Sequence, residues 1–240
     1  MTYCVGLLLD AGIVLLSDTR TNAGLDNIAV YRKMFLFEKP DDRVVAILTA
    51  GSLSITQTVL ARLNEAIELD DDEVPSLMNC DTMLEVAELV GKTLSDVTVD
   101  VRSKMERMSQ KASASMLVAG QRKGGVIRLF LIYPEGNFIE ASNDTPYLQI
   151  GEHKYGKPIL DRVVQSNTSL SDAKKAVLLS MDSTLRSNLS VGMPLDMAVI
   201  ETDALKVSEK RRIEPDDDHF RAMSAAWSDA LRRSFEDIEV

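Results

Sequence analysis

The apolar residues in the first part of the chain fall into short runs that turn residues separate. Two of these runs, residues 3–9 and 13–16, predict strands that Asp10, Ala11 and Gly12 join as a β-hairpin. Neither run alternates between apolar and polar positions, so we expect their sheet to be covered on both faces. The remaining predicted strands cover residues 31–38, 43–50, 115–121, 126–133, 138–141 and 195–202, the last with a partner over 204–208.

Longer segments carry apolar residues at every third or fourth position, which is the period of a helix with one buried face. The first such stripe, Ile55, Val59, Leu63 and Ile67, follows Ser52, a residue type that caps helices. The other stripes predict helices over residues 81–105, 155–165, 171–189 and 219–238. The helices therefore come as two pairs and one terminal helix.

The order of these elements predicts the architecture. The chain begins with strands, followed by a pair of helices, further strands, a second pair of helices, final strands and a terminal helix. Antiparallel hairpins interrupted by helical pairs favour two sheets with a layer of helices outside each, which is an α+β fold. No internal repeat, linker or low-complexity segment divides residues 1–240, so we expect a single domain.

The terminal helix, residues 219–238, carries an apolar stripe that includes Phe220, Trp227 and Phe235. We expect this stripe to pack on the core of its own chain, and contact with a neighbouring subunit is the alternative. The length of the helix and its position late in the chain keep the second interpretation open.

Composition narrows the classes of function. Of the 240 residues, 45% are apolar and 27% are charged, which is typical of a globular domain. The formal net charge of −10, without a stripe of basic residues, argues against binding to nucleic acid. The 2 cysteines and 2 histidines supply neither a disulfide framework nor a His-based triad or metal site. We therefore expect no metal and no organic cofactor.

The apolar segments do not resemble targeting or membrane segments. The N-terminal run contains Asp10 and has no basic segment before it, unlike a secretory signal peptide. No stretch of the sequence reaches the ~18–20 apolar residues that a membrane span requires. We expect a cytoplasmic protein without membrane partners.

Three residues near the start of the chain supply a hydroxyl, a carboxylate and an amine. Thr2 follows Met1 and is small enough for the methionine to be removed. The new α-amine, with a pKa near ~8, would be partly neutral and would serve as the base for the Thr2 hydroxyl. Lys33 would favour deprotonation of the hydroxyl, and Asp18 would hold the lysine and keep it charged. The three residue types alone are also compatible with a purely structural role.

The order of the sequence motifs is more specific than these residue types. The chain resembles the bacterial Anbu family, the proteasome-like ancestral β-subunits, in SDTRTNAGLDNI (17–28), YRKMF (31–35), GEHKYGKPILDR (151–162) and RSNLSVGMPLD (186–196). The resemblance covers essentially the whole chain. It implies an N-terminal nucleophile hydrolase with a four-layer α-β-β-α sandwich that assembles with copies of itself.

The resemblance also assigns roles to individual residues. It implies that Thr2 is the nucleophile and that Asp18 and Lys33 are its carboxylate and lysine. It further implies that the backbone N–H of Gly51 donates to the oxyanion, an interaction typically worth ~10²–10³ in rate. The implied substrate pocket is lined by Thr21, Tyr31, Phe35, Thr49 and Leu53.

Around the nucleophile the chain departs from the proteasome pattern. Proteasome subunits usually carry a Ser after a Gly, where this chain has Glu152 after Gly151. Proteasome subunits also carry an Asp and a Ser later in the chain. Here Ser187 replaces the Asp, and Ser190 matches the Ser, so the resemblance implies that Ser190 is part of the site. Because neighbouring residues fix the geometry of catalytic groups, these changes bear on proteolytic efficiency.

The predicted function is a proteasome-like threonine peptidase or amidohydrolase that acts on peptide or protein substrates within a homo-oligomer. Two alternatives stay open: a specialised amidase for one small peptide or amide, and a non-catalytic scaffold whose Thr2 has lost its role. Retention of Met1 would favour the scaffold, because a blocked amine cannot act as the base. Nothing in the sequence identifies an unfoldase partner.

Overall fold

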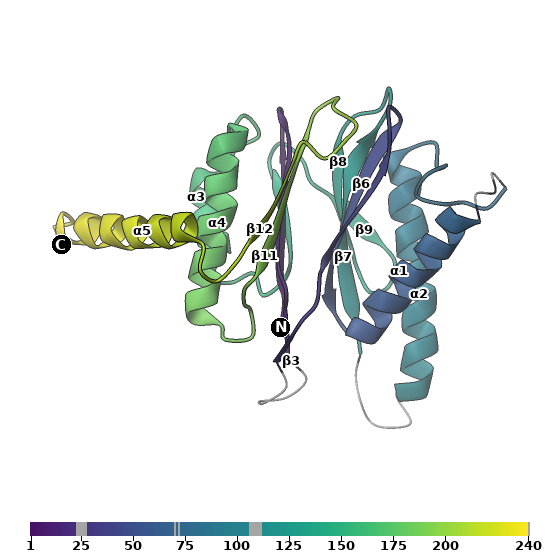
Figure 1. Ribbon diagram of the computed structural model, residues 1–240, viewed down its shortest axis with the longest axis horizontal. Helices are drawn as coiled ribbons and strands as arrows, with labels where there is room; N and C mark the ends of the chain where they lie inside the picture. The colour runs from purple at the N-terminus through teal and green to yellow at the C-terminus, as the bar shows by residue number, and fades with distance from the viewer. Residues whose placement is uncertain (23–27, 70, 72, 106–111, 240) are drawn as a thin grey trace.

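The computed structural model describes residues 1–22, 28–69, 71, 73–105 and 112–239. Two five-stranded antiparallel sheets face each other, and helices cover the outer face of each sheet (Figure 1). The layers follow the order helix, sheet, sheet, helix, so the predicted four-layer α-β-β-α sandwich is confirmed. In the part of the chain that the structure describes, no helix has an apolar stretch long enough to cross a bilayer.

The first sheet has the strand order β10-β1-β2-β11-β12. Its centre is the predicted hairpin, formed by β1 (Tyr3–Leu9) and β2 (Gly12–Asp18). The other strands are β10 (Tyr147–Gly151), β11 (Leu195–Glu201) and β12 (Glu209–Ile213). Side chains on both faces of β1 and β2 are buried, which explains why neither strand alternates between apolar and polar residues.

The second sheet has the strand order β5-β6-β7-β8-β9. Its long pair, β6 (Arg43–Gly51) and β7 (Ala114–Arg122), is almost wholly buried. The other strands are β5 (Met34–Lys39), β8 (Arg128–Ile132) and β9 (Phe138–Glu140), and a separate ribbon contains β3 (Arg20–Asn22) and β4 (Ile28–Val30). The ribbon follows β2 and precedes β5, so the chain passes from the first sheet to the second between Asp18 and Lys33.

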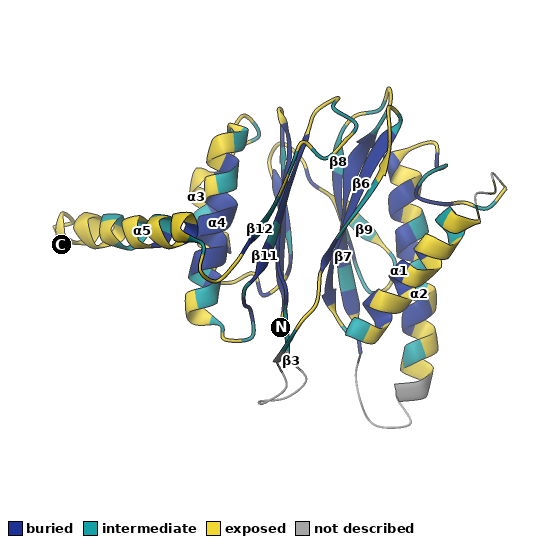
Figure 2. Cartoon of the chain, in the orientation of Figure 1, coloured by how far each residue is buried: buried dark blue, intermediate teal, exposed yellow. Residues whose placement is uncertain are grey.

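The helices form the outer layers of the sandwich. They are α1 (Leu53–Glu68) and α2 (Met83–Met105) over the second sheet, and α3 (Lys157–Val163) and α4 (Leu170–Ser187) over the first. Buried residues line the faces of the helices and sheets that meet, and exposed residues cover the outside (Figure 2). A third apolar cluster, which includes Leu15, Leu48 and Leu117, fills the space between the sheets. Apolar burial in three layers therefore holds the sandwich together.

Helix α5 (Asp218–Glu236) projects away from the sandwich (Figure 1). Its buried residues are Phe220 and Ser224, close to its start, where Ser224 Oγ bonds to Asp182 of α4 at 2.7 Å. Farther along, Leu231 is 51% exposed and Phe235 is 79% exposed. The expectation that the apolar stripe packs on its own core is therefore wrong for all but the first turns.

The strand predictions differ from the structure in several places: β3 and β4 are additional strands, the turn of the first hairpin is Asp10 and Ala11 because Gly12 already pairs with Leu9, and two further segments differ. Residues 147–151 form β10, an edge strand of five residues whose sequence YLQIG has no clear period and was not expected to be a strand. The partner of β11 is β12 and not residues 204–208. Asp203 and Leu205 adopt φ angles of 65° and 50°, which turn the chain before it can pair.

Candidate active site

The β1–β2 hairpin brings the start of the chain beside Asp18. In the hairpin register Cys4 lies opposite Ser17, so Tyr3 comes next to Asp18. The backbone N–H of Tyr3 donates to Asp18 Oδ1 at 3.1 Å. Thr2, which directly precedes the strand, is thereby placed near this carboxylate, with 9% of its surface exposed.

Lys33 reaches the same carboxylate from the side of the second sheet. Its carbonyl accepts the N–H of Thr49 at 2.9 Å, which fixes the residue against β6. Its Nζ donates to Asp18 Oδ1 at 2.7 Å and to the Arg20 carbonyl at 2.6 Å. Because Lys33 is only 5% exposed, water competes little for this ion pair. The ion pair therefore joins the two sheets close to the start of the chain.

Asp18 is fully buried and is surrounded by donors. Besides the bonds from Tyr3 and Lys33 to its Oδ1, the N–H groups of Arg20 and Gly192 each donate to its Oδ2 at 3.2 Å. Burial raises the pKa of the Asp18 carboxyl, while the Lys33 charge and the hydrogen bonds oppose this shift. With donors on both oxygens, the carboxylate holds the Lys33 ammonium in one position.

A cavity of about 300 Å³ opens beside Thr2 and Lys33. Gly51, the last residue of β6, forms part of its wall with a φ of +106°. A Cβ at this position would lie 2.3 Å from the Ser113 carbonyl oxygen, so only glycine fits. The other lining residues are Met1, Thr21, Thr49, Ala50, Leu53, Thr56 and Gly151. Lys33 is the only charged side chain among the described lining residues, and its charge is paired with Asp18.

The cavity brings most of the predicted site residues together. Thr2, Lys33 and Gly51 line it together with the predicted pocket residues Thr21, Thr49 and Leu53. Asp18 lies behind Lys33 and is bonded to it. Thr56, on α1, is a lining residue that the sequence did not single out; its hydroxyl donates to the Leu53 carbonyl at 3.1 Å.

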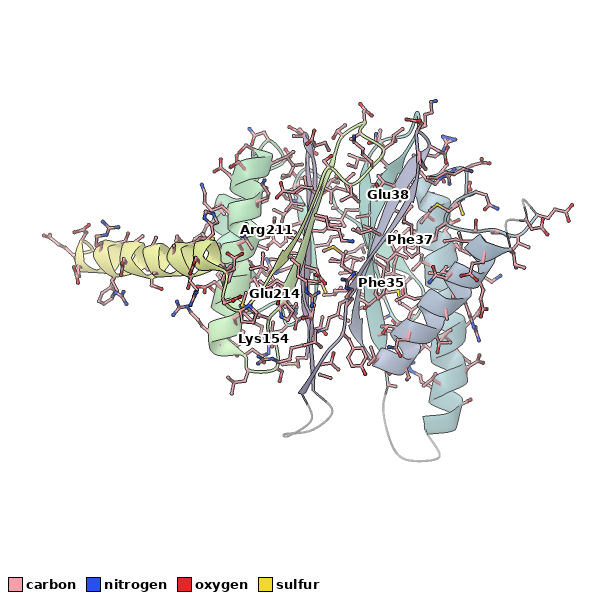
Figure 3. The ribbon with its side chains drawn as sticks, in the orientation of Figure 1. Phe35, Phe37, Glu38, Lys154, Arg211 and Glu214 are labelled. Carbon is pink, nitrogen blue, oxygen red and sulfur yellow. The ribbon has the colours of Figure 1, made fainter. Side chains whose placement is uncertain are left out.

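Three other predicted residues are not among the residues described as lining the cavity. Phe35 lies on β5, at the edge of the second sheet, and packs against the apolar cluster under α1 and α2 (Figure 3). Tyr31 lies just after β4 and is 41% exposed. Ser190 lies in the loop that follows α4, where its N–H donates to Asn188 Oδ1 at 2.9 Å.

The α-amine at the start of the chain lies in an unusual environment. Burial and the nearby charge of Lys33 lower the pKa of the Met1 amine, and the charge of Asp18 opposes the shift. A lower pKa means that a larger fraction of the amine is neutral at physiological pH. This end of the chain therefore favours the base form of an amine.

Known proteins with the same sequence pattern and fold identify the family. The family model described as "Proteasome subunit" matches residues 2–200. Anbu from Hyphomicrobium sp. strain MC1, solved as a Gly-1 mutant, is 49% identical with a TM-score of 0.92, over 100% of this chain and 99% of that one. The chain belongs to the Anbu family of proteasome subunits. The resemblance that the motifs predicted is thereby confirmed.

Two further Anbu structures agree with this assignment. Anbu from Yersinia bercovieri is 43% identical with a TM-score of 0.90, over 99% of this chain and 98% of that one. The structure described as the helical assembly of the Anbu complex from Pseudomonas aeruginosa is 43% identical with a TM-score of 0.93, over 99% and 97%. No curated protein matches the sequence.

In this member of the Anbu family, residues far from Thr2 in the sequence complete its surroundings. The Thr2 carbonyl accepts the N–H of Glu152 at 2.6 Å. Gly151, with a φ of +82°, permits this approach, because a Cβ there would lie 2.0 Å from the Thr2 carbonyl oxygen. Glu152 is 7% exposed, and Asn188 Nδ2 donates to its carboxylate at 3.1 Å. The only sequence signal for these contacts is that Gly151 and Glu152 lie in the motif of residues 151–162 and Asn188 lies in the motif of residues 186–196.

Proposed function

We propose that the chain is a threonine-type peptidase or amidohydrolase in which Thr2, once Met1 is removed, attacks peptide or amide carbonyls. The observation that carries the proposal is the buried ion pair between Lys33 and Asp18, 2.7 Å long, next to Thr2 at the wall of a cavity. A buried ion pair costs desolvation free energy and is weak evidence for stability. A fixed positive charge beside a hydroxyl, however, lowers the cost of forming an alkoxide, which is what a threonine nucleophile needs.

The proposed cycle has an acylation and a hydrolysis half. Thr2 Oγ bonds to the carbonyl carbon while the Thr2 α-amine takes the hydroxyl proton, directly or through a water. Negative charge moves to the carbonyl oxygen, which accepts a hydrogen bond from the Gly51 N–H. The amine then gives the proton to the leaving nitrogen as the C–N bond breaks, which leaves an ester on Thr2. A water hydrolyses the ester and restores the hydroxyl.

The electrostatics of the site support the amine as the base. Burial and the charge of Lys33, which lower the pKa of the Met1 amine, act on any amine at this end of the chain. Lys33 Nζ donates to Asp18 Oδ1, so we assign the lysine the role of a fixed positive charge and the amine the role of the base. Among the described residues, Lys33 forms an ion pair with a carboxylate and the Met1 amine forms none, which supports this division of roles.

The lining of the cavity favours substrates that have an uncharged side chain next to the cleaved bond. Thr21, Thr49 and Thr56 present small polar groups, and Leu53 adds an apolar surface. A volume of about 300 Å³ suits a side chain of medium size in an extended peptide or a small amide. Cleavage of a peptide library separates the two classes of substrate, because a specialised amidase would accept one residue at this position and a general peptidase many.

Self-association is the second part of the proposal, and helix α5 favours it. Leu231 and Phe235 are exposed on a helix that projects from the sandwich. Full burial of such a side chain is worth about 1.5–3 kcal/mol, which a second copy of the chain would supply. The similar Anbu complex from Pseudomonas aeruginosa is described as a helical assembly. A scaffold without catalysis would keep this contact and lack the chemistry of Thr2.

Intact mass before and after incubation with a peptide epoxyketone, an electrophile directed at threonine, tests the proposal. The expected result is loss of Met1 and one covalent adduct on Thr2. The adduct should be absent from Thr2→Ala, slower to form in Thr2→Ser, and unaffected in Thr58→Ala, which removes an exposed hydroxyl from α1. A retained Met1, or a free Thr2 that forms no adduct, would favour the scaffold.

A further inference from the structure

A polar bracket connects the backbone segment that holds Thr2 to the backbone segment that holds Asp18. We define it as the side chains of Glu152 and Asn188 with the loop of residues 188–192. We infer that Asn188 is a positioning residue for the nucleophile, because its amide joins the two segments. The inference rests on the proposed function, since the position of Thr2 affects a reaction only if Thr2 reacts.

One end of the bracket is the turn after β10. The Glu152 N–H donates to the Thr2 carbonyl at 2.6 Å, so the position of Glu152 determines where the start of the chain lies. Glu152 is 7% exposed, and its carboxylate accepts the N–H of Lys154 at 3.2 Å and Asn188 Nδ2 at 3.1 Å. No ion pair among the described residues includes Glu152. Because a buried carboxylate is costly without hydrogen bonds, the loss of either of these two neutral donors would strongly destabilise Glu152 in its present position.

The other end of the bracket is the loop after α4. Asn188 Oδ1 accepts the N–H of Ser190 at 2.9 Å, which bends the loop as an Asx turn does. Two residues later, the N–H of Gly192 donates to Asp18 Oδ2 at 3.2 Å. Asn188 therefore uses its amide nitrogen on the Glu152 carboxylate and its amide oxygen on the loop. Only a side chain that is donor and acceptor at once can do both.

Asn188→Asp tests this chemistry at nearly constant size. The substitution replaces the donor to Glu152 with a second carboxylate, 3.1 Å from Oε2 in the present geometry. Two carboxylates this close do not both ionise readily, so the pair holds one proton up to a raised pKa. While the proton is bound, an O–H···O bond replaces the N–H···O bond and the bracket persists. Once the proton is lost, repulsion opens the bracket, so the defect should grow with pH.

The experiment compares the rate of the epoxyketone adduct in Asn188→Asp with the wild-type rate between about pH 5.5 and 8.5. We expect a ratio within about twofold of one at the acid end and about one tenth or less at the alkaline end, because small displacements of a nucleophile are costly. Protonation of the amine slows both proteins alike and cancels in the ratio. Asn143→Asp, which makes the same charge change at an exposed turn, should keep a ratio near one throughout. A ratio for Asn188→Asp that does not change with pH overturns the inference.

Hydrogen exchange measured by mass spectrometry adds a readout that does not require Thr2 to react. Because the Gly192 N–H bonds to Asp18 only while the loop keeps its shape, its exchange should accelerate about tenfold or more in Asn188→Asp at alkaline pH, relative to wild type. Asn143→Asp should leave this exchange unchanged. A wild-type protein that never forms the adduct contradicts the proposed function alone. Unchanged exchange of Gly192 in Asn188→Asp contradicts the inference whether or not Thr2 reacts.

Discussion

The candidate site and helix α5 differ in which residue types they bury; most of α5 beyond its start is exposed (Figure 2). At the site, Asp18, Lys33 and Glu152 are buried, while on α5 the apolar Leu231 and Phe235 are exposed. Burying charge costs free energy that nearby donors must offset, and leaving apolar surface in water forgoes favourable burial. Neither choice is what the stability of a single chain would favour. The contrast indicates that both regions have a role beyond the stability of the core. We propose that this role is a reaction at the candidate site and contact with a second copy of the chain at α5.

The two regions also differ in how firmly they are held. The site lies where both sheets meet, and Asp18 alone receives bonds from β1, from the loop after α4 and from Lys33 beside β5. Helix α5 is attached through its first turns, where Ser224 bonds to Asp182 and to Arg186. Substitutions at the site should therefore change the free energy of unfolding far more than substitutions near the end of α5.

The largest effect is expected from Lys33→Met. It leaves the carboxylate of Asp18 buried without its cation, which should lower the free energy of unfolding by about 3–5 kcal/mol at neutral pH and abolish the Thr2 adduct. Because burial already raises the pKa of Asp18, the variant should regain stability as the pH falls and the carboxyl takes up a proton. Urea unfolding at pH 7.5 and pH 5 measures this recovery.

A matched control for Lys33→Met is Lys174→Met. Lys174 also pairs with a carboxylate at 2.7 Å, that of Glu209, but both side chains are partly exposed. Its loss should cost about 0–1 kcal/mol at either pH. Equal losses for the two variants would contradict the interpretation that burial makes the Asp18 pair sensitive.

A smaller loss, about 2–4 kcal/mol, is expected from Gly51→Ala. The new methyl group would meet the Ser113 carbonyl oxygen, and the backbone would have to leave a φ of +106°. Gly124→Ala is the control, because its φ of +73° is also positive but nothing lies within 4 Å of the added atom. Its expected cost is about 1 kcal/mol by urea unfolding. If the two glycines proved equally tolerant, the tight approach at Gly51 would not be a constraint.

The raised pKa of Tyr3 predicts how the free energy of unfolding changes at alkaline pH. Burial raises the pKa of Tyr3 well above its ordinary value of 10.0, so above pH 10 the unfolded chain loses a proton that the folded chain keeps. The free energy of unfolding should therefore fall with rising pH, by up to about 1.4 kcal/mol per pH unit from this group.

Tyr3→Phe isolates this contribution. The variant loses the hydrogen bonds of the Tyr3 hydroxyl to Ser180 and Gln149, both 2.6 Å, which should cost about 1–3 kcal/mol at neutral pH. It should also lose stability less steeply above pH 10 than the wild type does. Tyr155→Phe, at a residue that is 41% exposed, should change neither quantity. Parallel pH curves for wild type and Tyr3→Phe would exclude Tyr3 as the source of the slope.

The smallest effect on folding is expected on α5. Replacing Leu231 and Phe235 together by serine should change the free energy of unfolding of one protomer by less than about 0.5 kcal/mol. The same variant should shift sedimentation velocity towards smaller species, because the surface proposed to bind a second copy is lost. Val126→Ser, at a residue that is 74% exposed outside α5, should leave both quantities unchanged. Undiminished association of the α5 variant would place the contact elsewhere.

Local pattern predicted the parts of the protein that local physics decides. Apolar periodicity located the helices and most strands, because a residue buried on one face recurs with the period of its element. The sequence predicted the first hairpin but with a three-residue connection, whereas Gly12 pairs with Leu9 and the turn is Asp10 and Ala11 alone. This observed register places Tyr3, and hence Thr2, beside Asp18. The motif blocks added the family, and the resemblance to that family added the role of Gly51. What the sequence determined by itself was therefore the layers of the fold and the hydroxyl and carboxylate of the site.

Only the tertiary structure decided which distant groups complete the site and where α5 points. Gly192 donates to Asp18 across 174 residues of chain, and Glu152 and Asn188 meet because β10 pairs with β1 at the edge of the first sheet while α4 covers that sheet. Every residue except proline carries the same backbone N–H, so no residue type marks the amide that will be needed. The apolar stripe of α5 likewise has the same period whether its partner is the chain's own core or another molecule. An amphipathic sequence indicates that the apolar face of the helix will be covered, and only tertiary or quaternary packing decides what covers it.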